Sequence, residues 1–310
     1  MGVRACLPNF SVAAVAIGTL IGAVPGVLGQ RPLLALVASQ TDVGNRFPEV
    51  GSLVVWSRPN SEGRPEGLLA NCSGALIHER VFLTAGHCVG PSLPVLPPSI
   101  DVAISFSHSN AFDRTTWLPV ERQVIHPSLP ASCQTIPGCD PTTTNAFRAL
   151  DPERADLGLA ILARPVRNIQ PALLATPGTL TRPDAIAREM TVVGYGSTAP
   201  PPGGIAPMPL PRLLWDGARR FRESTLDKVV NDYWATWTLP SRVCFGDSGA
   251  PTFAYERSAD RATRRLVAVV SDGGLDCSSR DARVRVDTVP VQEWINRVIR
   301  QDVGGRGTRR

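Results

Sequence analysis

Lysine is almost absent from this chain of 310 residues, which has a single lysine, Lys228, among its 32 basic residues. Aromatic residues make up only 6%, and no run of basic residues is interleaved with them. The formal charge of +5 therefore indicates solubility and weak binding, and a nucleic-acid partner is not expected. The four histidines are not clustered and no CxxC pair occurs, so we expect no metal site.

Helical periodicity is also scarce. It is sustained only at 291–301, where apolar residues recur at helical spacing and predict a C-terminal helix. Elsewhere, short alternating stretches are separated by turns rich in glycine and proline. They predict strands at 52–56, 75–77, 81–84, 102–106, 120–125, 157–162, 190–195, 266–271 and 284–289. Many short strands without intervening helices are typical of an all-β sandwich or barrel.

The first residues differ from the rest. Residues 1–7 carry one arginine, and an apolar run of small residues follows at 11–29. We interpret 1–29 as a signal peptide, cleaved after Gly29, although a cut near Ala35 or Ala38 remains an alternative. An uncleaved membrane anchor is the other reading, but the glycines and the proline of the run make it a poor lasting span.

Cysteine usage agrees with export. Removal of Cys6 with the leader leaves six cysteines, which allow fifteen pairings: Cys72, Cys88, Cys133, Cys139, Cys244 and Cys277. Two proline-rich segments, 91–100 and 198–211, are predicted to be surface loops inserted into the domain 30–310. A role for these segments as extended ligands of another domain is the less common alternative.

Two short segments each place a reactive side chain in a turn framed by glycine and cysteine. They are Leu-Thr-Ala-Gly-His-Cys at 83–88 and Cys-Phe-Gly-Asp-Ser-Gly-Ala-Pro at 244–251. A serine hydroxyl is a poor nucleophile unless a base lies within reach and a carboxylate orients that base. Asp156 stands at the head of the apolar run 157–162, where a strand would hold it rigid. His87, Asp156 and Ser248 are therefore the candidate triad.

The carboxylate of the triad has two rival candidates. Asp151 and Glu153 are alternative acids, but they precede the strand in a polar loop. The remaining histidines of the chain are expected to be structural.

The order of these three residues and the wording of their segments resemble the chymotrypsin-like serine proteases, which carry TAAHC, a DIAL-type run and GDSGGP. Supporting segments at 47–48, 124–127, 194–196, 270–273 and 294–295 follow the family order, so the resemblance spans about residues 36–299. It implies an all-β fold of two six-stranded antiparallel β-barrels, with the active site between them and a C-terminal helix. We expect a secreted or periplasmic, monomeric bacterial member.

The resemblance also implies the chemistry. His87 would act as the base, Asp156 would stabilise it, and the N–H groups of Gly246 and Ser248 would form the oxyanion hole. Disulfides Cys72–Cys88 and Cys244–Cys277 are implied, which leaves Cys133 and Cys139 to close a local loop.

The expected function is hydrolysis of peptide bonds in proteins or peptides, without cofactor, metal or lasting membrane partner. A catalytically silent binding protein of the same fold is the first alternative. An esterase is the second, but the serine does not sit in a G-x-S-x-G elbow and does not come first in the chain.

Two features depart from the family pattern. Arg242 stands where trypsins carry the acid of their substrate pocket, with Ser271, Asp272, Gly273 and Val284 as the other expected substrate-binding residues. A preference for acidic or small apolar side chains follows.

The second departure concerns activation. Ala35, not a basic residue, precedes Leu36 at the position of the family's new amino terminus. Trypsin-type activation is therefore not expected: either processing frees an amine near Leu36, or Asp247 has another partner.

Overall fold

The computed structural model describes residues 39–59, 66–89, 99–129, 151–185, 189–198, 215–238, 243–257, 262–273, 277 and 280–304. All lie in the compact unit Leu33–Arg310, which alone is considered below. Several predictions fall outside the described residues: the signal peptide, most of both proline-rich loops, Arg242, and the pair Cys133 and Cys139.

The first six long strands close into an antiparallel barrel. Hydrogen bonds join them in the ring order β2-β3-β4-β7-β6-β5. The strands are β2 (Val50–Ser57), β3 (Gly67–His78), β4 (Val81–Ala85), β5 (Ile100–Ser105), β6 (Trp117–Ile125) and β7 (Leu157–Leu162). A closed ring leaves no strand edge unpaired, and the inward-facing apolar side chains fill its interior.

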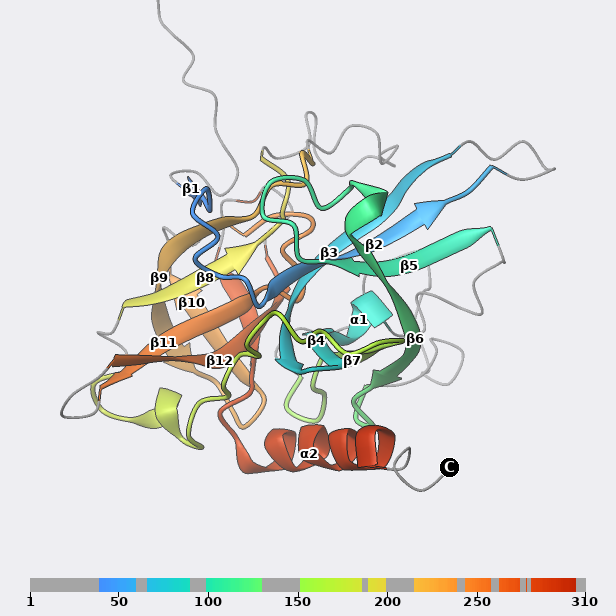
Figure 1. Ribbon diagram of the computed structural model, residues 1–310. Coiled ribbons are helices and arrows are strands. Elements are labelled where there is room, and N and C mark those ends of the chain that lie inside the picture. Colours follow the sequence, from blue (N-terminus) through green and yellow to red (C-terminus); the bar gives the residue numbers. More distant parts are fainter. Residues whose placement is uncertain are drawn as a thin grey trace, which may run out of the picture. The chain divides into compact units, whose positions relative to one another are not determined.

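A second antiparallel ring follows in the chain. Its order is β8-β9-β10-β13-β12-β11, with β8 paired to β9, and β1 (Gln40–Thr41) pairs with the first two residues of β9. The strands are β8 (Glu189–Gly194), β9 (Arg220–Val229), β10 (Trp234–Thr238), β11 (Pro251–Arg257), β12 (Ala262–Asp272) and β13 (Asp281–Arg285). The predicted all-β fold of two six-stranded barrels is confirmed (Figure 1).

Three strands of the second barrel were not predicted: β9, β10 and β11. In β9 the alternation of apolar residues is hidden, because the buried positions include Arg222 and Ser224, which are 6% and 1% exposed. A polar residue facing inward is recognisable only when the partners that satisfy it are known.

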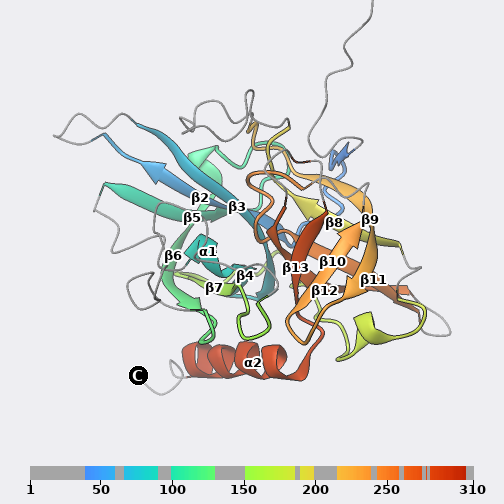
Figure 2. The ribbon, with the colours of Figure 1, turned by 180° about the vertical axis from the view of Figure 1, so that it is seen from behind.

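The C-terminal helix α2 (Val289–Gly304) runs along one edge of the strands in both views (Figures 1 and 2). Its Trp294 packs edge-on against His126, which directly follows β6, with ring centroids 4.9 Å apart. The helix thus covers part of the first barrel although it follows the second in the chain. In the described part of the chain, the helices are too short or too polar to cross a membrane. The described residues also contain the short helix α1 (Gly86–Val89) and 3-10 turns at Arg114–Thr116 and Thr179–Thr181.

Candidate active site

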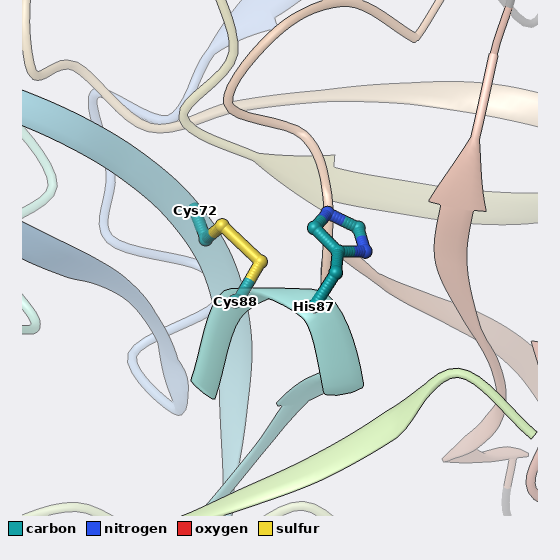
Figure 3. Close-up of side chains that lie close together, drawn as sticks. All are labelled: Cys72, His87 and Cys88. Atoms are coloured by element: carbon teal, nitrogen blue, oxygen red, sulfur yellow. A yellow bond between two sulfur atoms is a disulfide. The ribbon is translucent and has the colours of Figure 1, made fainter. Parts of the chain in front are cut away.

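His87 projects from the one-turn helix α1, which begins where β4 ends. The neighbouring Cys88 is bonded to Cys72 of β3, so a disulfide ties this turn to the barrel wall, beside the His87 ring (Figure 3). The side chains of Cys72, His87 and Cys88 lie within 4.8 Å of one another. Because both sulfurs are used in the disulfide, this trio does not offer the thiolate ligands of a metal site.

Asp156 binds His87 through both carboxylate oxygens. Oδ1 accepts the backbone N–H of His87 at 2.8 Å, and Oδ2 lies 2.7 Å from ring Nδ1. Ser271, at the end of β12, donates its hydroxyl to the same Oδ2 at 2.6 Å. Asp156 is 1% exposed, so a residue of the first barrel is held in a buried position by a residue of the second.

The charges of this pair reinforce each other. Burial alone would raise the pKa of Asp156, but the charge of His87 and the hydrogen bonds from His87 and Ser271 outweigh it, and the pKa lies below 3.8. Burial likewise acts to lower the pKa of His87, but the charge and hydrogen bond of Asp156, with a contribution from the charge of Asp272, raise it above 6.5. The arrangement therefore favours an imidazolium paired with a carboxylate.

Ser248 lies in a tight turn, residues 244–250, which we call the serine turn. Cys244 at its start is bonded to Cys277, the second implied disulfide. The carbonyl oxygen of Ser248 accepts the N–H of Ser73 in β3 at 2.7 Å and lies 3.9 Å from Sγ of Cys88. These backbone contacts bring the serine turn against the helix that carries His87.

The carbonyl groups of the serine turn are all engaged from Phe245 to Ser248. Phe245 accepts from the N–H of Ser197 and from Nε1 of Trp215, at 2.7 and 2.8 Å. Gly246 accepts from the Ser73 hydroxyl at 2.8 Å, and Asp247 accepts from the N–H of Ala250 at 2.8 Å.

The N–H groups show the opposite pattern. Within the described residues, those of Gly246 and Ser248 donate to no protein acceptor. A trans peptide directs its N–H opposite to its C=O, so fixing the Phe245 and Asp247 carbonyls fixes these two donors. Unused N–H groups beside a serine are the kind of donors that an anion-binding position requires.

Two glycines make this turn possible. Gly246 has φ +97° and Gly249 has φ +85°, in the left-handed region that side chains disfavour. At Gly249 a Cβ would also lie 2.1 Å from the carbonyl oxygen of Ser73. The serine turn therefore depends on glycine both for its backbone angles and for its close approach to β3.

The side chain of Asp247 is buried and is bound by backbone N–H groups. Its Oδ1 accepts the N–H of Gly196 at 2.9 Å and its Oδ2 that of Cys244 at 3.0 Å. Burial raises its pKa to about 7, against the lowering effect of these bonds and of the charges of Arg283 and Arg220. Another partner for Asp247 was one of the two sequence alternatives, and these backbone donors are such partners. The segment around Leu36 lies outside the described residues.

The predicted substrate-binding residues occupy different environments. Ser271 is buried and bonded to Asp156, while the neighbouring Asp272 is exposed. Gly273 is partly buried, and a Cβ there would lie 2.7 Å from Cγ2 of Val243. Val284 is completely buried in an apolar cluster with Val269 and Trp234, its partners on the adjacent strands, so its side chain packs in the core.

Sequence reasoning missed a buried ion pair on β13. Arg283 donates through Nε and Nη2 to both carboxylate oxygens of Asp281, at 2.8 and 3.0 Å, and lies over the ring of Trp237. Both members of the pair have side chains that are 0% exposed. Their spacing of two residues was the available signal, since alternate residues of a strand share a face.

Comparison with known proteins agrees with this architecture. The sequence model of the trypsin family matches residues 59–295. Chymase of Rattus norvegicus is 38% identical to this chain over 65 residues, which cover 20% of the chain and 23% of the chymase. The chain thus aligns with about a quarter of the length of that curated relative.

Proposed function

The chain belongs to the trypsin family, and from this premise we propose that it is a serine endopeptidase with the triad His87, Asp156 and Ser248. The observation that carries the proposal is the two-point attachment of His87 to buried Asp156, at 2.8 and 2.7 Å. This attachment fixes the ring tautomer that carries its proton on Nδ1 and leaves Nε2 as the base.

In the first half-reaction, Oγ of Ser248 attacks the carbonyl carbon of a peptide bond and gives its proton to Nε2 of His87. The carbonyl oxygen becomes an oxyanion, which the N–H groups of Gly246 and Ser248 stabilise. The intermediate collapses with cleavage of the C–N bond, and His87 returns the proton to the leaving amine. Water then hydrolyses the acyl-enzyme by the same steps.

Asp156 remains ionised throughout and stabilises the imidazolium that forms at His87. Its lowered pKa and the raised pKa of His87 support this role. A carboxylate in this position is worth several orders of magnitude in turnover in the worked example of the trypsin-type triad.

The physiological setting is part of the proposal. The signal peptide predicted at 1–29 and the two disulfides, Cys72–Cys88 and Cys244–Cys277, support export to an oxidising compartment. The substrates would be proteins or peptides. The acidic or small apolar preference remains a proposal that rests on Arg242, which is not among the described residues.

The test is labelling of the purified protein with a fluorophosphonate probe, with mass spectrometry to locate the modified residue and the mature amino terminus. We expect modification of Ser248, its loss in Ser248→Ala, and at least a thousandfold slower reaction in His87→Ala. A mixed peptide library analysed in parallel should be cleaved by the wild type only. A folded wild-type protein that neither reacts with the probe nor cleaves the library would contradict the proposal and favour a silent binding protein.

A further inference from the structure

The side chain of Ser73 in β3 attaches the serine turn to the first barrel. Its hydroxyl donates to the carbonyl of Gly246 at 2.8 Å and accepts the N–H of Tyr195 at 2.8 Å. Ser73 is 0% exposed, and its hydroxyl joins two backbone segments that are 173 and 122 residues away in the chain.

The N–H groups of Gly246 and Ser248, the proposed oxyanion donors, belong to two peptides that are joined by a single peptide. The Gly246 carbonyl is part of this joining peptide. The Gly246–Asp247 peptide separates the peptides that carry the N–H groups of Gly246 and Ser248. The dihedral angles on either side of this linking peptide set the angle between the two donor peptides, and Gly246 offers little resistance to a change because glycine has no side chain to restrict φ. Its orientation therefore depends on what holds its carbonyl.

We propose that Ser73 is a positioning residue of the active site, whose hydroxyl fixes the Gly246–Asp247 peptide and thereby aligns the oxyanion donors. The inference rests on the proposed function. It assigns to a residue of β3 a role that neither the triad nor the pocket motifs contain.

A hydroxyl is suited to this position because it can donate one hydrogen bond and accept others at the same atom. Loss of the hydroxyl would leave the Gly246 carbonyl and the Tyr195 N–H buried without their partner, a situation that proteins avoid. Ser73 also contributes its backbone, since its N–H binds the Ser248 carbonyl at 2.7 Å. That contact survives replacement of the side chain, so the variant isolates the hydroxyl.

Tyr195, whose N–H binds the Ser73 hydroxyl, is itself held by further hydrogen bonds. The Tyr195 carbonyl accepts from Nδ2 of Asn71 at 2.8 Å, and the Tyr195 hydroxyl donates to the Ser107 carbonyl at 2.9 Å. Tyr195 is 1% exposed. The Ser73 hydroxyl therefore links the serine turn, with its two left-handed glycines, to Tyr195, which is fixed in the core.

The experiment compares Ser73→Ala with Ser105→Ala. Ser105 is a matched control because it is also fully buried, lies in the same barrel, and makes two hydrogen bonds, with Thr116 and with the N–H of Ser107. The readouts are the second-order rate constant for a fluorophosphonate probe, kcat and KM for a cleaved library peptide, and urea denaturation.

We expect Ser73→Ala to react with the probe about 10- to 1000-fold more slowly than the wild type, and the upper limit is the loss of a complete oxyanion donor. Its kcat should fall by a similar factor while KM changes less than about threefold, because the donors act on the transition state. Ser105→Ala should keep wild-type kinetics even where its urea midpoint falls as much. Ser73→Thr, which retains a hydroxyl, should recover most of the rate.

A folded Ser73→Ala protein with wild-type probe and peptide kinetics would overturn the inference, as would equal kinetic losses in the two alanine variants. Where Ser73→Ala does not fold, the comparison passes to Ser73→Thr and Ser73→Cys. Because a thiol is a weak hydrogen-bond donor, the Ser73→Cys protein should then react with the probe at least tenfold more slowly than the Ser73→Thr protein. Equal rates would refute the positioning role of the hydroxyl. An unreactive wild type would instead refute the proposed function, and the inference with it.

Discussion

Ser271 donates its hydroxyl to Oδ2 of Asp156 over 2.6 Å, the same oxygen that lies 2.7 Å from Nδ1 of His87. Ser271 lies in β12 of the second barrel, whereas Asp156 directly precedes β7 and His87 follows β4 of the first. The proposed base is thus aligned by a contact that exists only when the two barrels are packed together. Four predictions follow from the surroundings of this site.

Ser271→Ala should reduce kcat about tenfold or more with little change in KM. The lost bond reaches a buried charge, and such bonds contribute about 1.5–3 kcal/mol. Steady-state kinetics on a cleaved peptide would measure the effect, with Ser105→Ala as the buried serine that touches neither Asp156 nor His87. Unchanged kcat in a folded Ser271→Ala protein would show that Asp156 is oriented without this hydroxyl.

Asp272→Asn should move the rise of kcat/KM to lower pH. His87 acts as a base only when neutral, so activity increases as pH rises through its pKa, and the charge of Asp272 contributes to raising that pKa. Because Asp272 is exposed, the difference from the wild type should shrink at high ionic strength. Asp232→Asn, at an exposed acid between β9 and β10, is the control, and an identical displacement in both variants would contradict the assignment.

Asp247 should make the protein less stable as pH rises. Burial raises its pKa to about 7, so between about pH 4 and 7 the folded state keeps a proton that the unfolded state releases. The stability from this group is complete below its unfolded pKa and is lost as pH rises through about 7. Urea denaturation at several pH values should give a steeper decline for the wild type than for Asp247→Asn. A wild type that gains stability relative to Asp247→Asn over this range would instead indicate an ionised Asp247 paired with a cation, such as a freed amine near Leu36.

Gly249→Ala should destabilise the fold by more than about 2 kcal/mol and abolish probe labelling. It combines an unfavourable φ of +85° with a Cβ placed 2.1 Å from backbone and side-chain oxygens of Ser73 and Thr84. Gly67→Ala is the matched control, since a Cβ there meets no atom within 4 Å. Circular dichroism during urea unfolding measures the free energy of unfolding of both variants, and equal stability of the two would refute the clash.

Much of the site could be predicted because its signals are local. The turns around His87 and Ser248 are framed by glycine and cysteine within a few residues, and Asp156 directly precedes an apolar strand. The disulfides Cys72–Cys88 and Cys244–Cys277 followed from the resemblance that these motifs carry, and both are present. The many short strands predicted an all-β sandwich or barrel and the resemblance implied the two barrels, although β9 to β11 were missed where inward positions are polar.

What the amino-acid sequence determined by itself is the set of reactive groups and the turns that expose them, because turn geometry depends on neighbouring residues. The tertiary structure alone decided which distant groups support them. Ser73 reaches Gly246 across 173 positions and Ser271 reaches Asp156 across 115. Neither serine stands out in the sequence, since a hydroxyl has a partner only after two barrels have folded and packed, and the same residue on another strand face would meet water.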